Sequence, residues 1–201
     1  ALVGLLGYFA TIFCIQTGIS MTGASMAALI NALTPVSVTI LAAIVLKEKI
    51  TPITLVCLAL ALAGAAIITT GAGTQGVVVV LISVVLWGLA SVFMRRLTAK
   101  YPAVLVTTYG MAISLFGHIP MGLYDLFTAP EVNIDLRVVL VVLYLGFFGS
   151  GVAQFTWVKC LSALPASTCS LFYPLQPVFS ALLGALLLKE KFTPAFFAGL
   201  L

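Results

Sequence analysis

Charged side chains are scarce in this sequence, and the few that occur avoid the long apolar runs. Only 7% of the residues are Asp, Glu, Lys or Arg, whereas 63% are hydrophobic. Between Ile50 and Met94 there is no charged residue at all. A soluble domain of 201 residues could not hide so much apolar surface from water. The composition therefore excludes such a domain and predicts an all-α chain in a lipid bilayer, because only hydrogen-bonded helices can cross there in segments of this kind.

The sequence also lacks the residue combinations that catalysis and metal binding require. It has one histidine, His118, and its four cysteines, Cys14, Cys57, Cys160 and Cys169, form no CxxC pair. There is no nucleophile with a base, no metal-ligand cluster and no phosphate-binding loop, so we expect no catalytic site, no metal and no cofactor. We interpret all five residues as packing residues. Proton coupling is the alternative for His118.

Hydropathy divides the chain into eight apolar segments. As helices the complete ones are about 28 to 36 Å long, enough to cross the hydrocarbon core. They cover 1–18, 23–46, 53–71, 77–97, 102–124, 138–160, 166–188 and 193–201. The first and last are truncated, so we expect a fragment. The sequence repeat described below would place the partner of the segment starting near Val77 about 65 residues before Ala1, so roughly 65 to 70 residues are expected to be missing in front. No Asp or Glu lies inside a complete segment, so the carboxylate relays of many proton pumps have no candidate.

The chain matches itself at an offset of 142 residues. Between 33–52 and 175–194, eleven of twenty positions are identical, including Pro35 with Pro177 and the LKEK run. Five crossings separate the copies, and an odd number means that they run in opposite directions through the membrane. Inverted repeats of this kind are the usual construction of secondary transporters, which bind their solute between the two copies.

The nine basic residues are distributed unequally between the two faces of the predicted membrane bundle. Six lie around the connections near residues 48, 98 and 162, and three lie on the other side, so these connections are predicted to be cytoplasmic. The net charge of +4 therefore reflects topology rather than nucleic-acid binding. The connection at 124–137 holds three of the five acids and is expected to be a solvated loop. We interpret Glu48 and Glu190, each flanked by lysines, as interfacial ion pairs.

Seven residues near the middle of the apolar segments are candidates for lining a binding site. Each of the two repeated prolines leaves a helical carbonyl without its partner, and a buried carbonyl or amide needs one. A ligand would supply it, and a packing kink without a ligand is the alternative. Trp87 lies at mid-depth, where it either faces a cavity or fills space. The predicted substrate-binding residues are Asn31, Pro35, Trp87, Gln154, Tyr173, Gln176 and Pro177.

Small residues recur at the same offset. Gly4 and Gly7 correspond to Gly146 and Gly149, and such residues permit close helix packing, with a hinge as the alternative. Gln154 follows Ser150 by four residues and precedes Trp157 by three, so the three side chains share one helical face.

These patterns resemble the EamA-type transporters of the drug/metabolite transporter superfamily. The resemblance rests on TPVSVTILAAIVLKEKIT followed by LALALAG, on its second copy QPVFSALLGALLLKEKFT, and on the Trp87-Gly88 pair. It implies a polytopic membrane helix bundle with ten helices in an inverted five-helix repeat. On that template residues 1–71 are helices three to five, and residues 77–201 are helices six to ten with the last truncated, so about eight helices are present.

The expected function is that of a secondary transporter, multi-pass in the cell membrane. It would move a small organic solute, such as an amino acid, a metabolite or a drug-like compound, by alternating access, with efflux as the expected direction. Because the visible segments place no charge at mid-depth, we expect a neutral, zwitterionic or amphipathic solute. The alternatives are a sugar-phosphate or nucleotide-sugar carrier of the same superfamily, a non-transporting scaffold and a membrane-embedded enzyme. The expected partners are the solute and the bilayer, without nucleic acid; a proton or ion gradient and a homodimer stay open.

Overall fold

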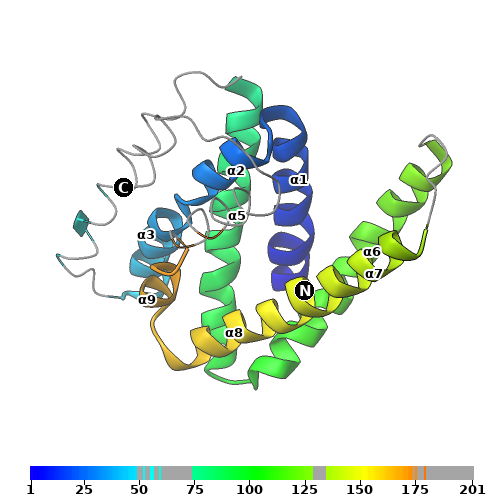
Figure 1. Ribbon diagram of the computed structural model, residues 1–201. Coiled ribbons are helices and arrows are strands. Elements are labelled where there is room, and N and C mark those ends of the chain that lie inside the picture. The colour runs from blue at the N-terminus through cyan, green and yellow to red at the C-terminus, as the bar shows by residue number, and fades with distance from the viewer. Residues whose placement is uncertain are drawn as a thin grey trace.

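Helix α5 (Thr74–Thr98) is the central element of the fold (Figure 1). The computed structural model describes residues 1–48, 74–128 and 135–173, together with 52, 55, 56, 59, 175 and 179. The first apolar run forms the π-helix η1 (Val3–Ala10) and α1 (Thr11–Thr22), and the second forms α2 (Ala24–Asn31) and α3 (Thr34–Leu46). Both α1 and α3 pack along α5.

The second half of the described chain leads away from α5 and returns to it. Helix α6 (Ala103–Thr128) packs against η1, and its far end extends away from α1 together with the start of α7 (Leu136–Tyr144) (Figure 1). The chain continues through the π-helix η3 (Leu145–Val152) into α8 (Ala153–Ala163), and α9 (Ala166–Ser170) then packs against α3. Asp135 is the N-cap of α7, since its carboxylate accepts a hydrogen bond of 2.9 Å from the amide of Val138.

Five of the eight predicted membrane segments are confirmed as helices of sufficient length and hydropathy to cross a bilayer. These are Val3–Thr22, Met26–Leu46, Gln75–Thr98, Ala103–Thr128 and Leu136–Ala163. The predicted helix at 193–201, and most of those at 53–71 and 166–188, lie outside the described residues. The apolar side chains of α7 are all exposed within the described part of the chain. Exposed apolar side chains are expected on a helix that contacts lipid or packs against a further helix.

The ends of three helices are joined at one face of the bundle. Near the end of α5, Arg95 donates a hydrogen bond of 2.7 Å to the carbonyl of Leu161 in α8. Arg96 donates one of 3.1 Å to the carbonyl of Val45 in α3. Guanidinium groups satisfy the last carbonyls of a helix and complement its negative end. The connections after α3, α5 and α8 therefore share one face, as the alternation of the apolar runs predicts.

The two π-helices recur at the offset of the sequence repeat. Adding 142 to the bounds of η1 gives 145–152, the bounds of η3. A π-helix is rare and is found mostly as a short interruption of an α-helix, frequently at functional sites. Two of them in corresponding positions indicate that the repeat extends from the residue types to the local backbone geometry.

Glycine permits close helix packing in the first of these segments. A Cβ atom added to Gly4 would lie 2.7 Å from the carbonyl oxygen of Gly110 in α6, and one added to Gly7 would lie 2.8 Å from Cβ of Ala90 in α5. The packing interpretation is therefore confirmed for Gly4 and Gly7. It is not confirmed for Gly146, around which the described residues leave nothing within 4 Å of such a Cβ.

Candidate functional site

Four aromatic side chains from distant parts of the chain meet beside α5. We call Tyr8, Trp87, Trp157 and Tyr173 the aromatic cluster. The Trp87 and Trp157 rings stack with centroids 6.3 Å apart, and the Trp157 ring meets Tyr173 edge-on at 5.1 Å. Tyr8 meets Trp87 edge-on at 6.2 Å. The cluster thus joins η1, α5, α8 and the residues after α9.

One hydrogen bond fixes the orientation of two of these rings. The indole N–H of Trp87 donates to the hydroxyl of Tyr173. A buried indole needs a polar partner for its N–H, and here that partner is Tyr173, another of the predicted site residues. Trp87 is only 8% exposed, so this pair forms part of the packed interior.

Several polar side-chain atoms, two of them in the aromatic cluster, are buried without a hydrogen-bond partner among the described residues. They are Tyr8 Oη, Gln154 Oε1 and Trp157 Nε1, together with Ser37 Oγ and Thr39 Oγ1 on α3. Gln154 and Trp157 lie on α8 at a spacing of three residues, so they share one face of that helix. A buried polar atom without a partner is costly, and its usual explanation is a water, an ion or a ligand. The set combines aromatic rings with a hydrogen-bond donor, the indole N–H of Trp157, and two acceptors, Gln154 Oε1 and Tyr8 Oη.

The break in the second membrane segment is satisfied locally. Helix α2 ends at Asn31 and α3 begins at Thr34, with Pro35 in its first turn. The carbonyl that Pro35 deprives of its partner is that of Asn31, and the Thr34 hydroxyl donates to it at 2.6 Å. The same hydroxyl lies 3.3 Å from Oδ1 of the Asn31 amide. This carbonyl therefore has a hydrogen-bond donor within the chain, and the lining of a site by Pro35 stays a prediction.

The structure thus groups some predicted site residues and not others. Trp87 and Tyr173 are in contact, and Gln154 lies one turn from Trp157, whereas Asn31 and Pro35 make the local contacts just described. Gln176 and Pro177 lie outside the described residues. Sequence reasoning did not select Tyr8 or Trp157 for the site. A signal for Tyr8 was available, because its repeat partner is Ser150, which shares a helical face with Gln154 and Trp157.

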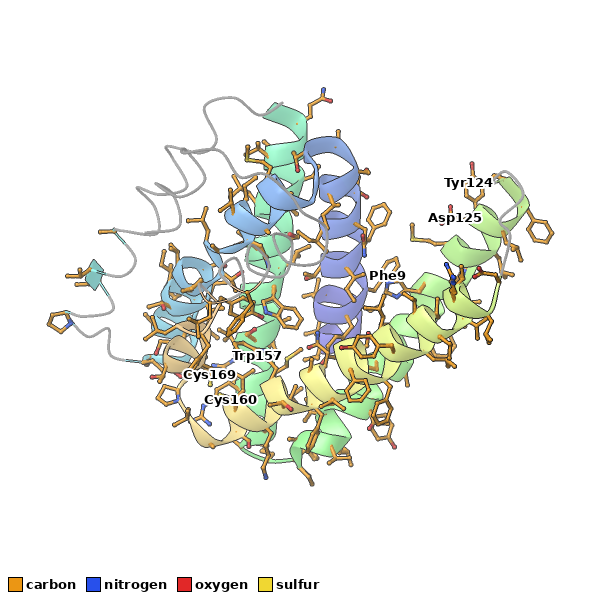
Figure 2. The ribbon with its side chains drawn as sticks, viewed as in Figure 1. Phe9, Tyr124, Asp125, Trp157, Cys160 and Cys169 are labelled. Atoms are coloured by element: carbon orange, nitrogen blue, oxygen red, sulfur yellow. The ribbon has the colours of Figure 1, made fainter. Side chains whose placement is uncertain are left out.

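The remaining polar candidates have structural contacts. His118 Nδ1 lies 3.0 Å from the carbonyl of Ser114, and its ring meets Phe9 edge-on at 5.1 Å, as a packing histidine does. The thiols of Cys160 and Cys169 lie 2.8 Å apart. Figure 2 shows this pair beside Trp157, with Phe9 on the side of η1 that faces α6, and Tyr124 and Asp125 at the far end of α6. Among the described residues no group of His, Cys, Asp and Glu could hold a metal ion.

A family model covers nearly the whole chain. The model of the EamA-like transporter family matches residues 1–70 and 74–201. The chain belongs to the EamA-like transporter family. The resemblance noted in the sequence is therefore confirmed, and the protein is a multi-pass membrane protein of this family.

Individual relatives agree with the assignment. This EamA-family chain is 28% identical over 206 residues to an uncharacterized transporter of Bacillus subtilis, YetK, covering 96% of the chain and 62% of the relative. An uncharacterized transporter of Archaeoglobus fulgidus is 30% identical over 176 residues, covering 87% of the chain and 63% of that protein. The chain thus spans less than two thirds of the length of these relatives.

A solved structure has the same fold. A crystal structure of a protein superposes with a TM-score of 0.77 at 21% identity, covering 98% of this chain and 72% of the other. At this level of identity the likeness concerns the fold alone.

Proposed function

We propose that this protein is a secondary transporter that carries a small organic solute across the membrane by alternating access, and that the solute binds beside the aromatic cluster. The observation that carries the proposal is the set of buried, unpartnered polar atoms on Tyr8, Gln154 and Trp157. Ligand sites are mostly apolar and aromatic with a few polar groups that fix orientation, and this set has that composition.

The position of the cluster supports the same proposal. Its rings come from segments far apart in the chain, namely residues 8, 87, 157 and 173. A solute held between them would contact both copies of the sequence repeat. Such a contact would let its binding energy differ between the two states of an alternating-access cycle.

The charges of the described residues favour a solute without a large net negative charge. Arg95 and Arg96, the two cations of α5, donate to carbonyl groups at the ends of other helices. An anionic sugar phosphate or nucleotide sugar would require a cation at its binding site. We therefore propose a neutral, zwitterionic or amphipathic solute, and we keep its direction of movement and any coupling ion open.

The test is solute movement in vesicles that contain the full-length protein. A pool of amino acids and small metabolites is presented with and without a pH gradient, and accumulation or efflux is followed by mass spectrometry. The proposal expects a solute whose movement is lost in Trp157→Ala and in Gln154→Leu. If the folded and inserted protein moves no solute, the result would contradict the proposal and favour the alternative of a non-transporting membrane scaffold.

A further inference from the structure

Glu48 connects the two copies of the repeat through one carboxylate. Its Oε1 atom accepts a hydrogen bond of 3.2 Å from the amide of Ala166. Its Oε2 atom accepts two hydrogen bonds from Ser167, one of 3.3 Å from the amide and one of 3.0 Å from the hydroxyl. The carboxylate follows α3 and the three donors begin α9, 118 residues later. The sequence interpretation of Glu48 as a simple ion pair with its neighbouring lysines therefore missed its main partners.

The chemistry of this contact is favourable on both sides. The first amides of a helix have no partner within the helix, and a carboxylate satisfies them. Hydrogen bonds to an ionised acceptor are also stronger than neutral ones. The three bonds thus hold the start of α9 against the end of α3 by more than apolar packing.

The backbone before Glu48 is arranged for this contact. Lys47 ends α3 in the left-handed region, with φ 56, which residues other than glycine and asparagine rarely adopt. The amide of Glu48 then donates to the carbonyl of Ala42 at 3.3 Å. The turn directs the chain away from the axis of α3 at the point where the carboxylate reaches α9.

The contact lies at the face where the other helix ends are joined. Arg95 and Arg96 bind the ends of α8 and α3 there, so the ends of α3, α5 and α8 and the start of α9 are tied together (Figure 1). Beneath this junction Cys169 and Ala166 are fully buried. In the described part of the chain, polar contacts join the helix ends at this face.

We propose that Glu48 is a gating residue whose carboxylate latches α9 to α3 and has to release it when the transporter opens to this face. The inference rests on the proposed function, because only a transporter has to open there. It assigns Glu48 a positioning role on the moving helices and no contact with the solute.

The buried thiol of Cys169 reports on the latch directly. In full-length protein whose Cys14, Cys57 and Cys160 are serine, a membrane-impermeant maleimide is added from the face of Glu48, and the rate of labelling is measured. Glu48→Gln keeps the shape and removes the charge, so we expect labelling about tenfold faster, as a loss of roughly 1.4 kcal/mol from the closed state would give. Ser167→Ala removes one of three bonds and is expected to give an intermediate rate.

Two variants serve as matched controls. Asp135→Asn changes another capping carboxylate, whose bond to Val138 lies within its own segment. Ser162→Ala removes a hydroxyl whose one hydrogen bond among the described residues goes to the nearby carbonyl of Lys159. Both are expected to label like the parent. Thermal unfolding of each variant in detergent shows whether it has folded. A folded Glu48→Gln that labels within twofold of the parent overturns the latch.

The labelling assay needs no solute, so the two proposals fail separately. Faster labelling of Glu48→Gln without movement of any solute would show that Glu48 holds α9 against α3 and would contradict the proposed function. Solute movement together with unchanged labelling of Glu48→Gln supports the function and contradicts the latch.

Discussion

Trp87 on α5 donates its indole N–H to the hydroxyl of Tyr173, which lies 86 residues later in the chain. At the repeat offset of 142 residues, Tyr173 corresponds to Asn31, the last residue of α2. In the first copy this residue ends α2, and its carbonyl accepts a local hydrogen bond from Thr34. In the second copy the side chain of Tyr173 accepts a hydrogen bond from α5. A position shared by two copies has acquired a different partner in each.

The pairing of Trp87 with Tyr173 should be measurable as a coupling. Tyr173→Phe leaves a buried indole N–H without a partner, which costs about 1–3 kcal/mol of stability. The double variant Trp87→Phe with Tyr173→Phe leaves no such group, so its loss is expected to be smaller than the sum of the single losses by about 1 kcal/mol. Unfolding free energies of the four proteins in mixed micelles give this value. Strict additivity would show that the hydrogen bond contributes nothing.

Gln154 is expected to matter for transport and not for folding. Its Oε1 atom is buried without a partner among the described residues, so Gln154→Leu removes a costly group, and stability should stay equal or rise by up to about 1 kcal/mol. Transport by the full-length protein should fall at least tenfold, as expected when one polar contact to a solute is lost. Gln16→Leu, at an exposed position on α1, is the control and should change neither. A Gln154→Leu protein that is less stable and still transports would identify a packing residue.

The apolar runs and the sparse charges were sufficient to predict the helical segments, because each segment carries that signal in its own residues. The break at Pro35 was predictable for the same reason. The partner of the Asn31 carbonyl was not predicted, although Thr34 is adjacent to Pro35, because either a hydroxyl or a ligand could have supplied the proton. Local sequence decides which group loses its partner, and the fold decides what replaces it.

The contacts of Glu48 and Tyr8 could not be derived from the residues of their own segments. Ala166 and Ser167 lie more than a hundred residues from Glu48, and the charges flanking it suggested a nearer partner. The π-helix geometry of 3–10 and 145–152 also leaves no mark in the hydropathy, since it depends on which carbonyl each amide reaches. The repeat offset is the one sequence signal that relates such distant positions.

The break between α2 and α3 gives a comparison of two threonines on one helix. The hydroxyl of Thr34 bonds the carbonyl of Asn31, whereas Thr39 Oγ1 is buried without a partner in the described part of the chain. Thr34→Val is therefore expected to cost about 1–2 kcal/mol of unfolding free energy, and Thr39→Val to be neutral or slightly stabilising. Thermal unfolding of both in detergent checks this. If Thr39→Val is the more damaging change, Thr39 has a polar partner outside the described residues.

The latch proposal also predicts that locking Glu48 to α9 stops transport. In a background without the four native cysteines, Glu48→Cys and Ser167→Cys are combined and oxidised with copper phenanthroline. The two thiols lose two electrons and two protons to the oxidant and form a disulfide. Transport is expected to fall on oxidation and to return with dithiothreitol. Glu48→Cys alone, treated identically, should show no such loss, and transport that continues through the crosslinked protein would contradict the latch.

Substitution of the two equivalent glycines, Gly4 and Gly146, tests whether both are required for close helix packing. Gly4→Ala would press a methyl group against Gly110 and Ile113 of α6, so a loss of about 1–3 kcal/mol is expected. Gly146 occupies the same position of the second copy, and nothing described lies within 4 Å of its added Cβ. Gly146→Ala should therefore stay within about 0.5 kcal/mol of the parent or gain stability, since alanine favours helix. The unfolding free energies of the full-length variants, measured in mixed micelles, test this prediction. Equal losses at both positions would mean that a helix packs on Gly146 as closely as α6 packs on Gly4.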